Sequence, residues 1–395
     1  MKEHSVDISN LPPSSSSAEV LRPLKKLEPT LPSRSYYEID FYQSELEHIW
    51  WQDWVCIGRS TDLLEKTSFK TVSVGGQSLI VLRNEQGELK AFHNTCRHRG
   101  SLLCERPRGE FENGRIVCPY HAWTYSLDGK LTHTPWRLSS DDFHPDDFGL
   151  YDVSVGEWGG NVFVNLSRSP ALTLDQRLAE IPSLFGNWHL ESAVSGFKYE
   201  KEVNCNWKIF WENFTECYHC PGIHPELCQV VPRYGNGVVR SSDHPDWDEQ
   251  TGPDLEAEPR LGDGMVTWSD DGQTDLPFFP YLSSYEKRVG QTFGTLMPSC
   301  FFAAHVDFVR LGYITPLEPE RTRVVIECLF PSETIESGFD ISSATRFIER
   351  LTNQDLRVCE LNQRGLRSHR HMQGVLVPQE YYTYQFQQWV RSRLL

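Results

Sequence analysis

Two short loops that each carry one cysteine and one histidine constrain this sequence more than any other feature. The first loop reads NTCRHRGS and contains Cys96 and His98, and the second reads VCPYHAWTY and contains Cys118 and His121. Each loop lies near the end of a strand-like apolar run, so two hairpin ends can face each other. Together they offer two thiolates and two imidazoles, which predicts a β-rich unit built around a metal centre.

The residues around the loops have the pattern of a small all-β domain. The segment QSLIVLRNEQGELKAFHNTC places two apolar runs on either side of a glycine-containing turn, which predicts a hairpin. The segment GRIVCPYHAWTYSLDGKLTH predicts a second hairpin that turns at Asp128-Gly129. WGGNVFVNLS predicts a further strand.

Structural zinc also accepts two cysteines and two histidines, so ligand order has to separate the alternatives. In the zinc-finger pattern the histidine pair stands apart from the cysteine pair, whereas here each loop holds one of each. That interleaved order is typical of a Rieske 2Fe-2S cluster, in which two cysteines bind one iron and two histidines bind the other. Residues 52–166 therefore resemble a Rieske domain. A binding module held together by zinc remains the alternative, and a colourless protein would favour it.

A second group of metal-binding residues lies in FTECYHCPGIH, residues 214–224. NWKIFWENFTECYHC predicts a helix that Pro221-Gly222 ends, and Pro225 keeps His224 out of the helical region. The resulting bend can bring His224 beside His219, which offers two imidazoles to one metal.

The two cysteines of this stretch are expected to stay out of the metal site. On a helix Glu216 and His219 share one face, while Cys217 and Cys220 lie on a face turned by about 100°. We therefore interpret the cysteines as core residues and expect neither a zinc site nor a disulfide pair.

Oxygen-activating ferrous sites use two histidines and one carboxylate, and the carboxylate can come from a distant segment. SATRFIERLTNQDLRVCELNQRGL predicts a long helix near the C-terminus. Asp355 lies four residues before Cys359 and seven before Asn362, a predicted inward stripe. Glu360 is the nearest alternative, and helix geometry alone leaves open whether Asp355 is a ligand or a solvated charge.

The motifs together resemble the catalytic α subunit of Rieske non-haem iron oxygenases, over residues 37 to 385. Within that family, ENFTECYHCPGIHPELC and CELNQRGL are most similar to the choline monooxygenase and glycine-betaine oxygenase branch. The resemblance implies three roles: a mononuclear iron held by His219, His224 and Asp355, a 2Fe-2S cluster held by Cys96, His98, Cys118 and His121, and a bridging acid, Glu216. Glu216 would connect His219 to His121 of a neighbouring chain in a homotrimer.

The expected fold class is α+β, with a small all-β Rieske domain and a helix-grip-like catalytic domain that contains an antiparallel sheet. The predicted organisation is a flexible arm over 1–34, an N-terminal helix over 35–51 that packs on the catalytic domain, the Rieske domain over 52–166 and the catalytic mononuclear iron domain over 167–395. Residues 232–290 are polar and rich in glycine and proline, and we expect loops over the site there.

The resemblance implies an O2-dependent hydroxylation of a carbon–hydrogen bond on a small organic substrate. The electrons would come from a separate NAD(P)H-dependent flavin/iron–sulfur reductase, because the chain has no dinucleotide fingerprint. A quaternary ammonium substrate would lose formaldehyde after hydroxylation of an N-methyl group, and an aromatic substrate would give a cis-diol or phenol. An electron carrier without oxygenase activity is a further alternative, but it would not need the second iron motif.

Aromatic residues near the motifs are candidates for the substrate pocket. A cage of such rings holds a quaternary ammonium group by cation–π attraction, and the same rings could stack on an aromatic substrate or form core. The candidates are Trp211, Tyr218, Phe301, Phe302 and His305.

Composition excludes several other classes of protein. A net charge of −16 and a pI of about 5.3 argue against nucleic-acid binding, which requires a basic surface. No apolar run approaches the ~20 residues of a membrane span, and the N-terminus lacks the apolar core of a signal peptide. Eleven scattered cysteines predict reduced thiols and a cytoplasmic protein rather than a disulfide framework.

Overall fold

The computed structural model describes residues 22–63, 65–243 and 260–394, and the chain forms two compact units. The small unit comprises Leu46–Arg177 and Pro298–Cys300, and the large unit comprises Met1–Glu45, Leu178–Met297 and Phe301–Leu395. None of the helices within the described ranges combines the length and the apolar character that a membrane span requires.

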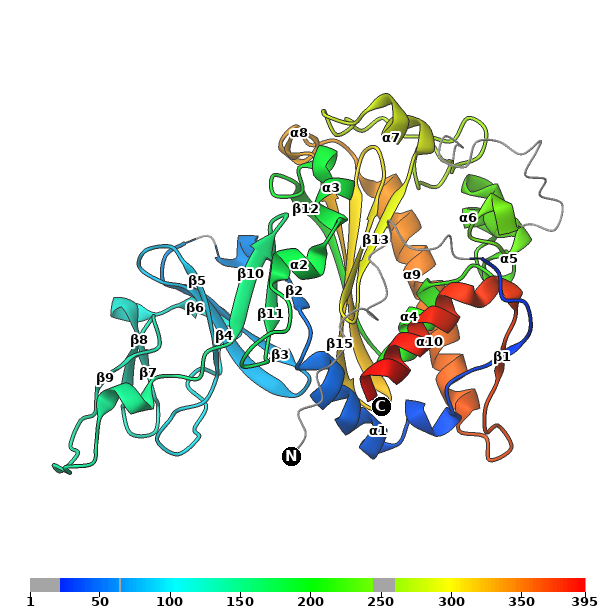
Figure 1. Cartoon of the computed structure of the whole chain (residues 1–395). Helices are drawn as coiled ribbons and strands as arrows, with labels where there is room; N and C mark the ends of the chain where they lie inside the picture. The colour runs from blue at the N-terminus through cyan, green and yellow to red at the C-terminus, as the bar shows by residue number, and fades with distance from the viewer. Residues whose placement is uncertain (1–21, 64, 244–259, 395) are drawn as a thin grey trace. The chain divides into compact units, whose positions relative to one another are not determined.

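The small unit is built from three antiparallel sheets (Figure 1). Their orders are β10-β11-β2, β5-β4-β3-β6 and β7-β8-β9. The strands are β2 (Val55–Arg59), β3 (Ser68–Val74), β4 (Gln77–Arg83), β5 (Leu89–His93), β6 (Arg108–Glu110), β7 (Arg115–Val117), β8 (Thr124–Ser126), β9 (Leu131–His133), β10 (Ser154–Trp158) and β11 (Asn161–Asn165). Its short helices are η3 (Leu46–Trp50), η4 (Ser60–Leu63), η5 (Glu112–Gly114), η6 (Pro145–Phe148) and α2 (Leu174–Leu178), whose last residue belongs to the large unit.

Both predicted hairpins of the small unit are confirmed. β4 pairs with β5, and β8 pairs with β9 across the Asp128-Gly129 turn. Gly129 has φ 79°, a left-handed conformation that glycine adopts without strain. A buried core that includes Phe69, Ile80 and Tyr125 also takes in the thiols of Cys96 and Cys118, so the two loops are fixed by the same packing that stabilises the sheets.

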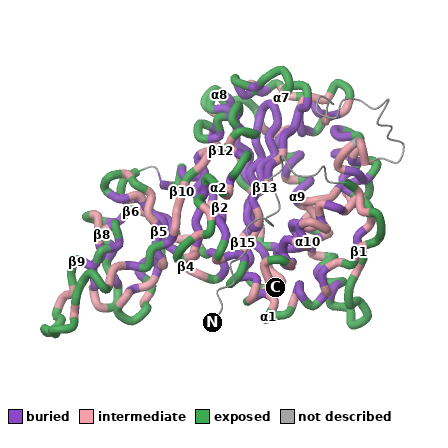
Figure 2. The backbone as a smooth tube through the Cα atoms, in the orientation of Figure 1, coloured by how far each residue is buried: buried purple, intermediate pink, exposed green. Residues whose placement is uncertain are grey.

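The large unit contains a five-stranded sheet in the order β12-β16-β15-β14-β13, and its pairs β12–β16 and β15–β16 are antiparallel. Strands β13 and β15 are mostly buried (Figure 2). The sheet strands are β12 (Val194–Val203), β13 (Thr292–Leu296), β14 (Cys300–Ala304), β15 (Val309–Glu318) and β16 (Arg321–Phe330). The expected α+β class with an antiparallel sheet is confirmed.

Helices α4, α9 and α10 pack together beside this sheet (Figure 1). The helices of the large unit are α1 (Ile39–Glu45), α3 (Ile181–Leu184), α4 (Trp207–Phe214), α5 (Cys220–Ile223), α6 (Pro225–Val230), α7 (Ser284–Val289), α8 (Ser332–Glu336), α9 (Ser342–Leu366) and α10 (Tyr381–Leu394). Shorter 3-10 turns are η2 (Ser33–Tyr36), η7 (Gly186–Trp188), η8 (Pro232–Asn236), η9 (Ser241–Asp243) and η10 (Pro378–Glu380).

Helix α9 confirms the predicted long C-terminal helix and corrects its inward stripe. Leu356 and Cys359 are buried, but Asn362 is exposed and Gln363 is buried in its place. A helix repeats every 3.6 residues, so a stripe that starts at Leu356 reaches Gln363 after two turns and leaves Asn362 outside. The Gln363 side chain accepts a hydrogen bond from the backbone N–H of Asn206 at 2.8 Å, which ties α9 to the start of α4.

Helix α4 begins at a buried ion pair and ends earlier than predicted. Asn206 caps its N-terminus by accepting a hydrogen bond from the Lys208 N–H, and the Lys208 ammonium lies 2.5 Å from a Glu45 carboxylate oxygen. Both of these charged side chains are fully buried. The helix ends at Phe214 rather than continuing to Pro221, and the chain turns at residue 215 and again at residues 218–219.

The N-terminal prediction is corrected in the residues that the structure describes. Residues 1–21 of the predicted flexible arm lie outside the described ranges. Beyond them, β1 (Glu28–Pro29) pairs antiparallel with β17 (Val375–Leu376), so the end of the predicted arm is held by backbone hydrogen bonding. The segment expected as one helix before β2 is α1 followed by η3, a short π-helical turn.

Candidate metal centres and their family

Three predicted ligands of the mononuclear iron converge in the large unit. His219, His224 and Asp355 each offer one ligand atom, and these atoms all lie within 4.8 Å of one another. The Oδ1 atom of Asp355 lies 2.8 Å from Nε2 of His224 and 3.4 Å from Nε2 of His219. Among the described residues, this is the one group of three or more such side chains arranged for a single metal ion.

The other ring nitrogen of each histidine is held by a hydrogen bond. Nδ1 of His219 lies 2.5 Å from a carboxylate oxygen of Glu216, and Nδ1 of His224 lies 2.8 Å from Oε1 of Gln354. The Gln354 amide N–H donates in turn to Glu226 at 2.8 Å. Acceptors at Nδ1 place the proton there and leave Nε2 free for a metal.

Sequence reasoning missed Gln354 and Glu226. Gln354 is the residue before the predicted ligand on the same helix, so it carried no separate motif. Its role becomes visible only when the loop that carries His224 is placed beside α9.

The protonation equilibria of the metal-free site follow from these contacts. Burial alone would lower the pKa of His219, but hydrogen bonds to Asp355 and Glu216 outweigh it and raise the pKa to about 10. Burial would raise the pKa of Asp355, but its bonds to the two imidazoles lower it to about 2. A carboxylate that stays ionised and two imidazoles aimed at it form a compact anchor for a divalent cation.

The local backbone that presents these ligands differs from the prediction. Pro221 and Gly222 do not end a helix, because they lie inside α5, and His224 stands at the junction of α5 and α6. Glu216 and His219 meet across a turn after α4 rather than on one helical face. A proline within the first turn of a helix loses no hydrogen bond, which explains why Pro221 is accommodated as the second residue of α5.

Cys217 and Cys220 form a disulfide, which corrects the expectation that they pack as separate core thiols. The prediction placed them on a continuous helix. The turn after Phe214 instead brings the two sulfurs together, with Cα atoms 4.9 Å apart. The remaining nine cysteines of the chain are free.

The four predicted cluster ligands lie in the two loops of the small unit. Cys96 and Cys118 are buried, whereas His98 is exposed and His121 is partly exposed. The imidazole rings of His98 and His121 lie 4.7 Å apart, and the indole of Trp123 stacks on His98 at 4.8 Å. Thiols on the inner side and imidazoles on the outer side suit a two-iron centre with one iron near solvent.

The loop backbone and one phenol support the buried thiols. The Tyr125 hydroxyl lies 3.2 Å from the Cys96 sulfur and accepts a hydrogen bond from the Arg97 N–H at 3.1 Å. Burial raises the pKa of the Cys96 thiol, while the hydrogen bond from Tyr125 lowers it. Hydrogen bonds to ligand sulfurs tune the reduction potential of such clusters, and sequence reasoning had missed Tyr125 in this position.

Both donor sets fit the metal groups that the motifs imply. Two buried thiols and two accessible imidazoles match a Rieske cluster, and two imidazoles with one carboxylate match a ferrous site with open positions.

The predicted pocket residues fall into three different environments. Tyr218 is 54% exposed and faces away from the core, whereas the other four are buried. Phe301 stacks on Phe214 at 4.1 Å, on the side of the sheet that carries α4. Phe302, the next residue on β14, points the other way and packs against Phe185.

Gly312 makes room for the Phe301 ring. A Cβ atom at this position of β15 would lie 2.1 Å from the ring, so only glycine allows the ring to cross the strand here.

His305 belongs to a group that sequence reasoning only partly found. Its ring lies 5.1 Å from the indole of Trp268, over which the Arg310 guanidinium is placed at 5.2 Å. Burial, with a smaller contribution from Arg310, holds the pKa of His305 well below its usual range, so this imidazole is neutral. Trp268 lies in the segment expected to be loops, and Arg310 lies in a strand with no motif, so neither gave a signal in the sequence.

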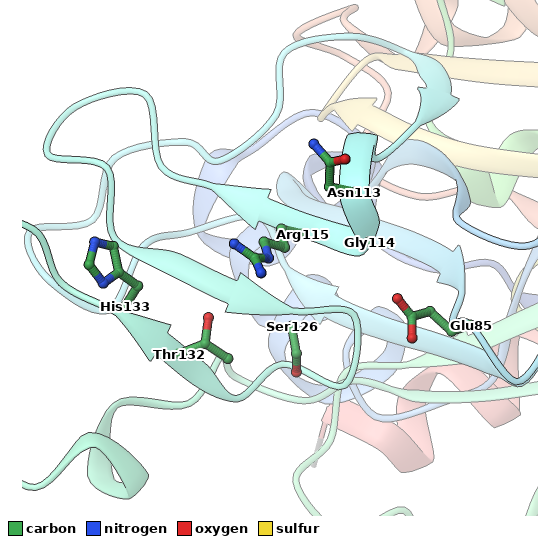
Figure 3. A pocket seen from close by; sticks show the side chains of 7 residues that line it. All are labelled: Glu85, Asn113, Gly114, Arg115, Ser126, Thr132 and His133. Atoms are coloured by element: carbon green, nitrogen blue, oxygen red, sulfur yellow. The ribbon is translucent and has the colours of Figure 1, made fainter.

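The small unit also contains a hollow of about 490 Å³ (Figure 3). None of the predicted metal ligands lines it. Its walls are Glu85, Asn113, Gly114, Arg115, Ser126, Thr132 and His133.

Comparison with protein families gives two matches that follow the two units. Residues 185–395 match the ring hydroxylating alpha subunit (catalytic domain), and residues 53–142 match the Rieske [2Fe-2S] domain. The resemblance drawn from the motifs is confirmed.

Individual relatives cover most of the chain. It is 29% identical to the glycine betaine monooxygenase oxygenase subunit of Chromohalobacter salexigens, over 87% of this chain and 81% of that protein. It is 26% identical to the chloroplastic choline monooxygenase of Beta vulgaris, over 92% and 77%. Among solved structures, a quaternary ammonium Rieske monooxygenase described for carnitine oxidation and inter-subunit electron transfer matches with a TM-score of 0.68. Its sequence identity is 21%, and the match covers 92% of this chain and 95% of that one.

The two family matches imply a Rieske cluster in the small unit and a mononuclear iron in the large unit, with electrons that a separate reductase takes from NAD(P)H. The chain therefore belongs to the ring-hydroxylating alpha-subunit family and is an iron-dependent oxygenase that carries a Rieske [2Fe-2S] domain.

Proposed function

We propose that this oxygenase hydroxylates an N-methyl group of a small quaternary ammonium compound. The observation that carries the proposal is the convergence of His219, His224 and Asp355 within 4.8 Å. The names of the relatives support the substrate class, since they act on glycine betaine, choline and carnitine.

The proposed reaction balances with two electrons and two protons. One oxygen atom of O2 enters the C–H bond of an N–CH3 group, and the other leaves as water. The resulting N–CH2OH group loses formaldehyde and leaves the amine with one methyl group fewer. The iron, when bound, supplies reductive activation of O2, and the Rieske cluster supplies electrons one at a time.

The chain's own residues have distinct roles in this proposal. His219, His224 and Asp355 would hold the iron, and Cys96, His98, Cys118 and His121 would hold the cluster. Glu216 accepts a hydrogen bond from Nδ1–H of His219, which orients the ligand. Gln354 does the same for His224.

We propose a homotrimer in which the cluster of one chain serves the iron of its neighbour. Support comes from the related structure described for inter-subunit electron transfer. Glu216 would then also accept a hydrogen bond from His121 of the adjacent chain. The reductase would be a flavin/iron–sulfur protein that uses NAD(P)H. Seven cysteines that neither form the disulfide nor belong to the predicted cluster support a cytoplasmic setting for this chain.

The test is oxygen uptake and formaldehyde release with a surrogate reductase, across glycine betaine, carnitine, choline and simple aromatic compounds. We expect one formaldehyde per O2 with at least one quaternary ammonium compound. Asp355→Ala should abolish both signals and the mononuclear iron, while the cluster spectrum stays unchanged. Turnover of aromatic compounds alone would make this chain an aromatic hydroxylase, and reduction without O2 uptake would make it an electron carrier.

A further inference from the structure

Arg310 is a buried cation whose hydrogen bonding is incomplete. It lies on β15, is 8% exposed, and its Nε atom is buried without a hydrogen-bond partner. No ion pair is found between Arg310 and the carboxylates of the described residues. Leaving a guanidinium buried and unpaired costs several kcal/mol, so the position requires a compensating partner.

Two aromatic rings lie beside this guanidinium, but neither offers its N–H groups an acceptor. Its central carbon lies 5.2 Å from the ring centroids of both Trp268 and Phe301. Ring faces attract the charge above and below the plane. The N–H groups point outwards within the plane, where rings supply no acceptor.

A second unpartnered polar group lies in the same place. His305 is 1% exposed, and neither of its ring nitrogens has a hydrogen-bond partner. The carbonyl of Gly290 is nearby but makes no hydrogen bond of ordinary geometry with the ring. Two unsatisfied side chains around one indole, that of Trp268, indicate a place built for a polar ligand.

This group is close to the candidate iron site. Asp355 is the residue whose charge most strongly opposes the effect of burial on the pKa of Arg310. No ion pair between Asp355 and the guanidinium is found among the described residues, and the Oδ1 atom of Asp355 contacts the two imidazoles. The ring of Phe301 joins the two places, since it contacts Phe214 near the end of α4 and lies under Arg310.

A planar, bidentate anion satisfies such a set of N–H groups best. Arginine N–H groups form a fixed fork that matches a carboxylate with two parallel hydrogen bonds. A hydroxyl group offers neither the charge nor the second oxygen. We infer that Arg310 binds the carboxylate of the substrate, so that the preferred compounds are zwitterions with a quaternary ammonium group at one end and a carboxylate at the other.

This inference rests on the proposed function and narrows it. Glycine betaine and carnitine carry such a carboxylate and choline does not. The relatives named above therefore include both kinds of enzyme: those named for a substrate with a carboxylate and one named for a substrate without it. Arg310 is on this account a specificity-determining residue that touches substrate and takes no part in oxygen chemistry.

The experiment compares three trimethylammonium compounds on the holoenzyme: glycine betaine, its methyl ester and choline. Calorimetry under nitrogen gives the Kd, and oxygen uptake gives KM and kcat. We expect glycine betaine to bind about 100-fold more tightly than the other two. Equal affinity for glycine betaine and its methyl ester would overturn the inference, and this comparison needs no variant.

Substitution then tests the residue. Arg310→Gln should raise the Kd and KM of glycine betaine about 100-fold while those of choline change less than about 3-fold. Arg310→Lys should recover part of the loss, since it restores charge without the fork. The matched control is Arg357→Gln, which removes the same charge from an exposed position on α9 and should change neither compound.

The outcomes separate this inference from the proposed function. If all three compounds are demethylated equally, and Arg310→Gln affects them equally, the carboxylate assignment fails and the oxygenase acts on quaternary ammonium compounds in general. If none of the three is bound or oxidised, the proposed function fails first, and the carboxylate assignment fails with it.

Discussion

Each candidate iron-ligand imidazole is fixed at both ring nitrogens, which has consequences for single substitutions. His219 lies between Glu216 and Asp355, and His224 lies between Gln354 and Asp355. The ligands are therefore oriented before metal arrives, and loss of an outer partner changes reactivity more than metal content.

The first prediction concerns Glu216→Gln. An amide oxygen can still accept a hydrogen bond from Nδ1 of His219, but it is a neutral acceptor in place of a charged one, and it also weakens the proposed bridge to the neighbouring cluster. We expect both metal centres to load and the cluster to reduce, while turnover falls at least about 100-fold. Iron analysis, the cluster spectrum and single-turnover kinetics measure the three quantities.

Glu360→Gln is the matched control for this prediction. Glu360 accepts hydrogen bonds from Asn204 and lies outside the three-ligand group, so the variant should keep its iron and its turnover. Normal turnover in Glu216→Gln would remove the bridging role, and iron loss in Glu360→Gln would reopen the choice of carboxylate.

The second prediction concerns the buried carboxyl group of Glu212. Burial raises its pKa to about 7, although hydrogen bonds from Tyr36 and Gln387 oppose this effect. The unfolded chain releases this proton near pH 4, whereas the folded chain keeps it up to about pH 7. The contribution of the Glu212 carboxyl group to the free energy of unfolding is therefore present in full below about pH 4. It is lost as the pH rises from about 4 to about 7.

Glu212→Gln should remove this pH-dependent loss, because an amide oxygen can still accept from Tyr36 and Gln387 without ionising. We expect the variant to gain about 3 kcal/mol of unfolding free energy at pH 8 and little at pH 4. Urea unfolding at the two pH values measures the difference. An equal effect at both values would show that ionisation of this group does not limit stability.

At the scale of secondary-structure elements, the first turn of α4 is held by the buried ammonium group of Lys208. The ammonium of Lys208 contacts Glu45, the Asn206 side chain and the Ser35 carbonyl, and the Trp207 indole donates to the same Glu45. Three segments of the large unit, η2, α1 and the start of α4, are thus joined by one buried polar network, in which every member has a partner.

The third prediction is that Lys208→Met destabilises the large unit by about 3–5 kcal/mol, since Glu45 is left buried and unpaired. Lys287→Met replaces the same residue type at an exposed position of α7 and should change stability little. Thermal unfolding of the two variants gives the comparison. A loss of less than about 1 kcal/mol in Lys208→Met would mean that the network relaxes around the missing charge.

Elements with a long periodic pattern were predictable from sequence, and elements that depend on short-range turns were not. α9 follows an apolar stripe through many turns, and the β4–β5 hairpin follows strand patterns with a glycine turn. The end of α4 and the Cys217–Cys220 disulfide depend on a local turn with no distinct signal. The same holds for Gln354 and Arg310, whose partners lie far away in sequence.

At the scale of the whole molecule, the chain carries an electron-transfer centre and an oxygen-activation centre in separate compact units. The types and the order of the ligand residues predicted both metal centres from the sequence, because only a few residue types can coordinate iron. Assembly left no such restriction in the sequence, so the proposed trimer rests on the family resemblance and on a related structure described for inter-subunit electron transfer.

The fourth prediction tests transfer between chains. Cys96→Ser removes a cluster ligand and Asp355→Ala removes an iron ligand, so each variant alone should be inactive. In trimers assembled from equal amounts of both, about a quarter of neighbouring pairs join an intact cluster to an intact iron site, and activity should return to about that fraction. Transfer within a chain would leave every mixture inactive, and separately purified variants mixed without exchange serve as the control.

The absence of a side chain at Gly312 ties that position to Phe301 in evolutionary terms. Any larger residue at 312 requires the side chain of residue 301 to move or to be smaller, because the ring in its present position and a Cβ atom there cannot coexist. Related chains should consequently vary at these two positions as a pair.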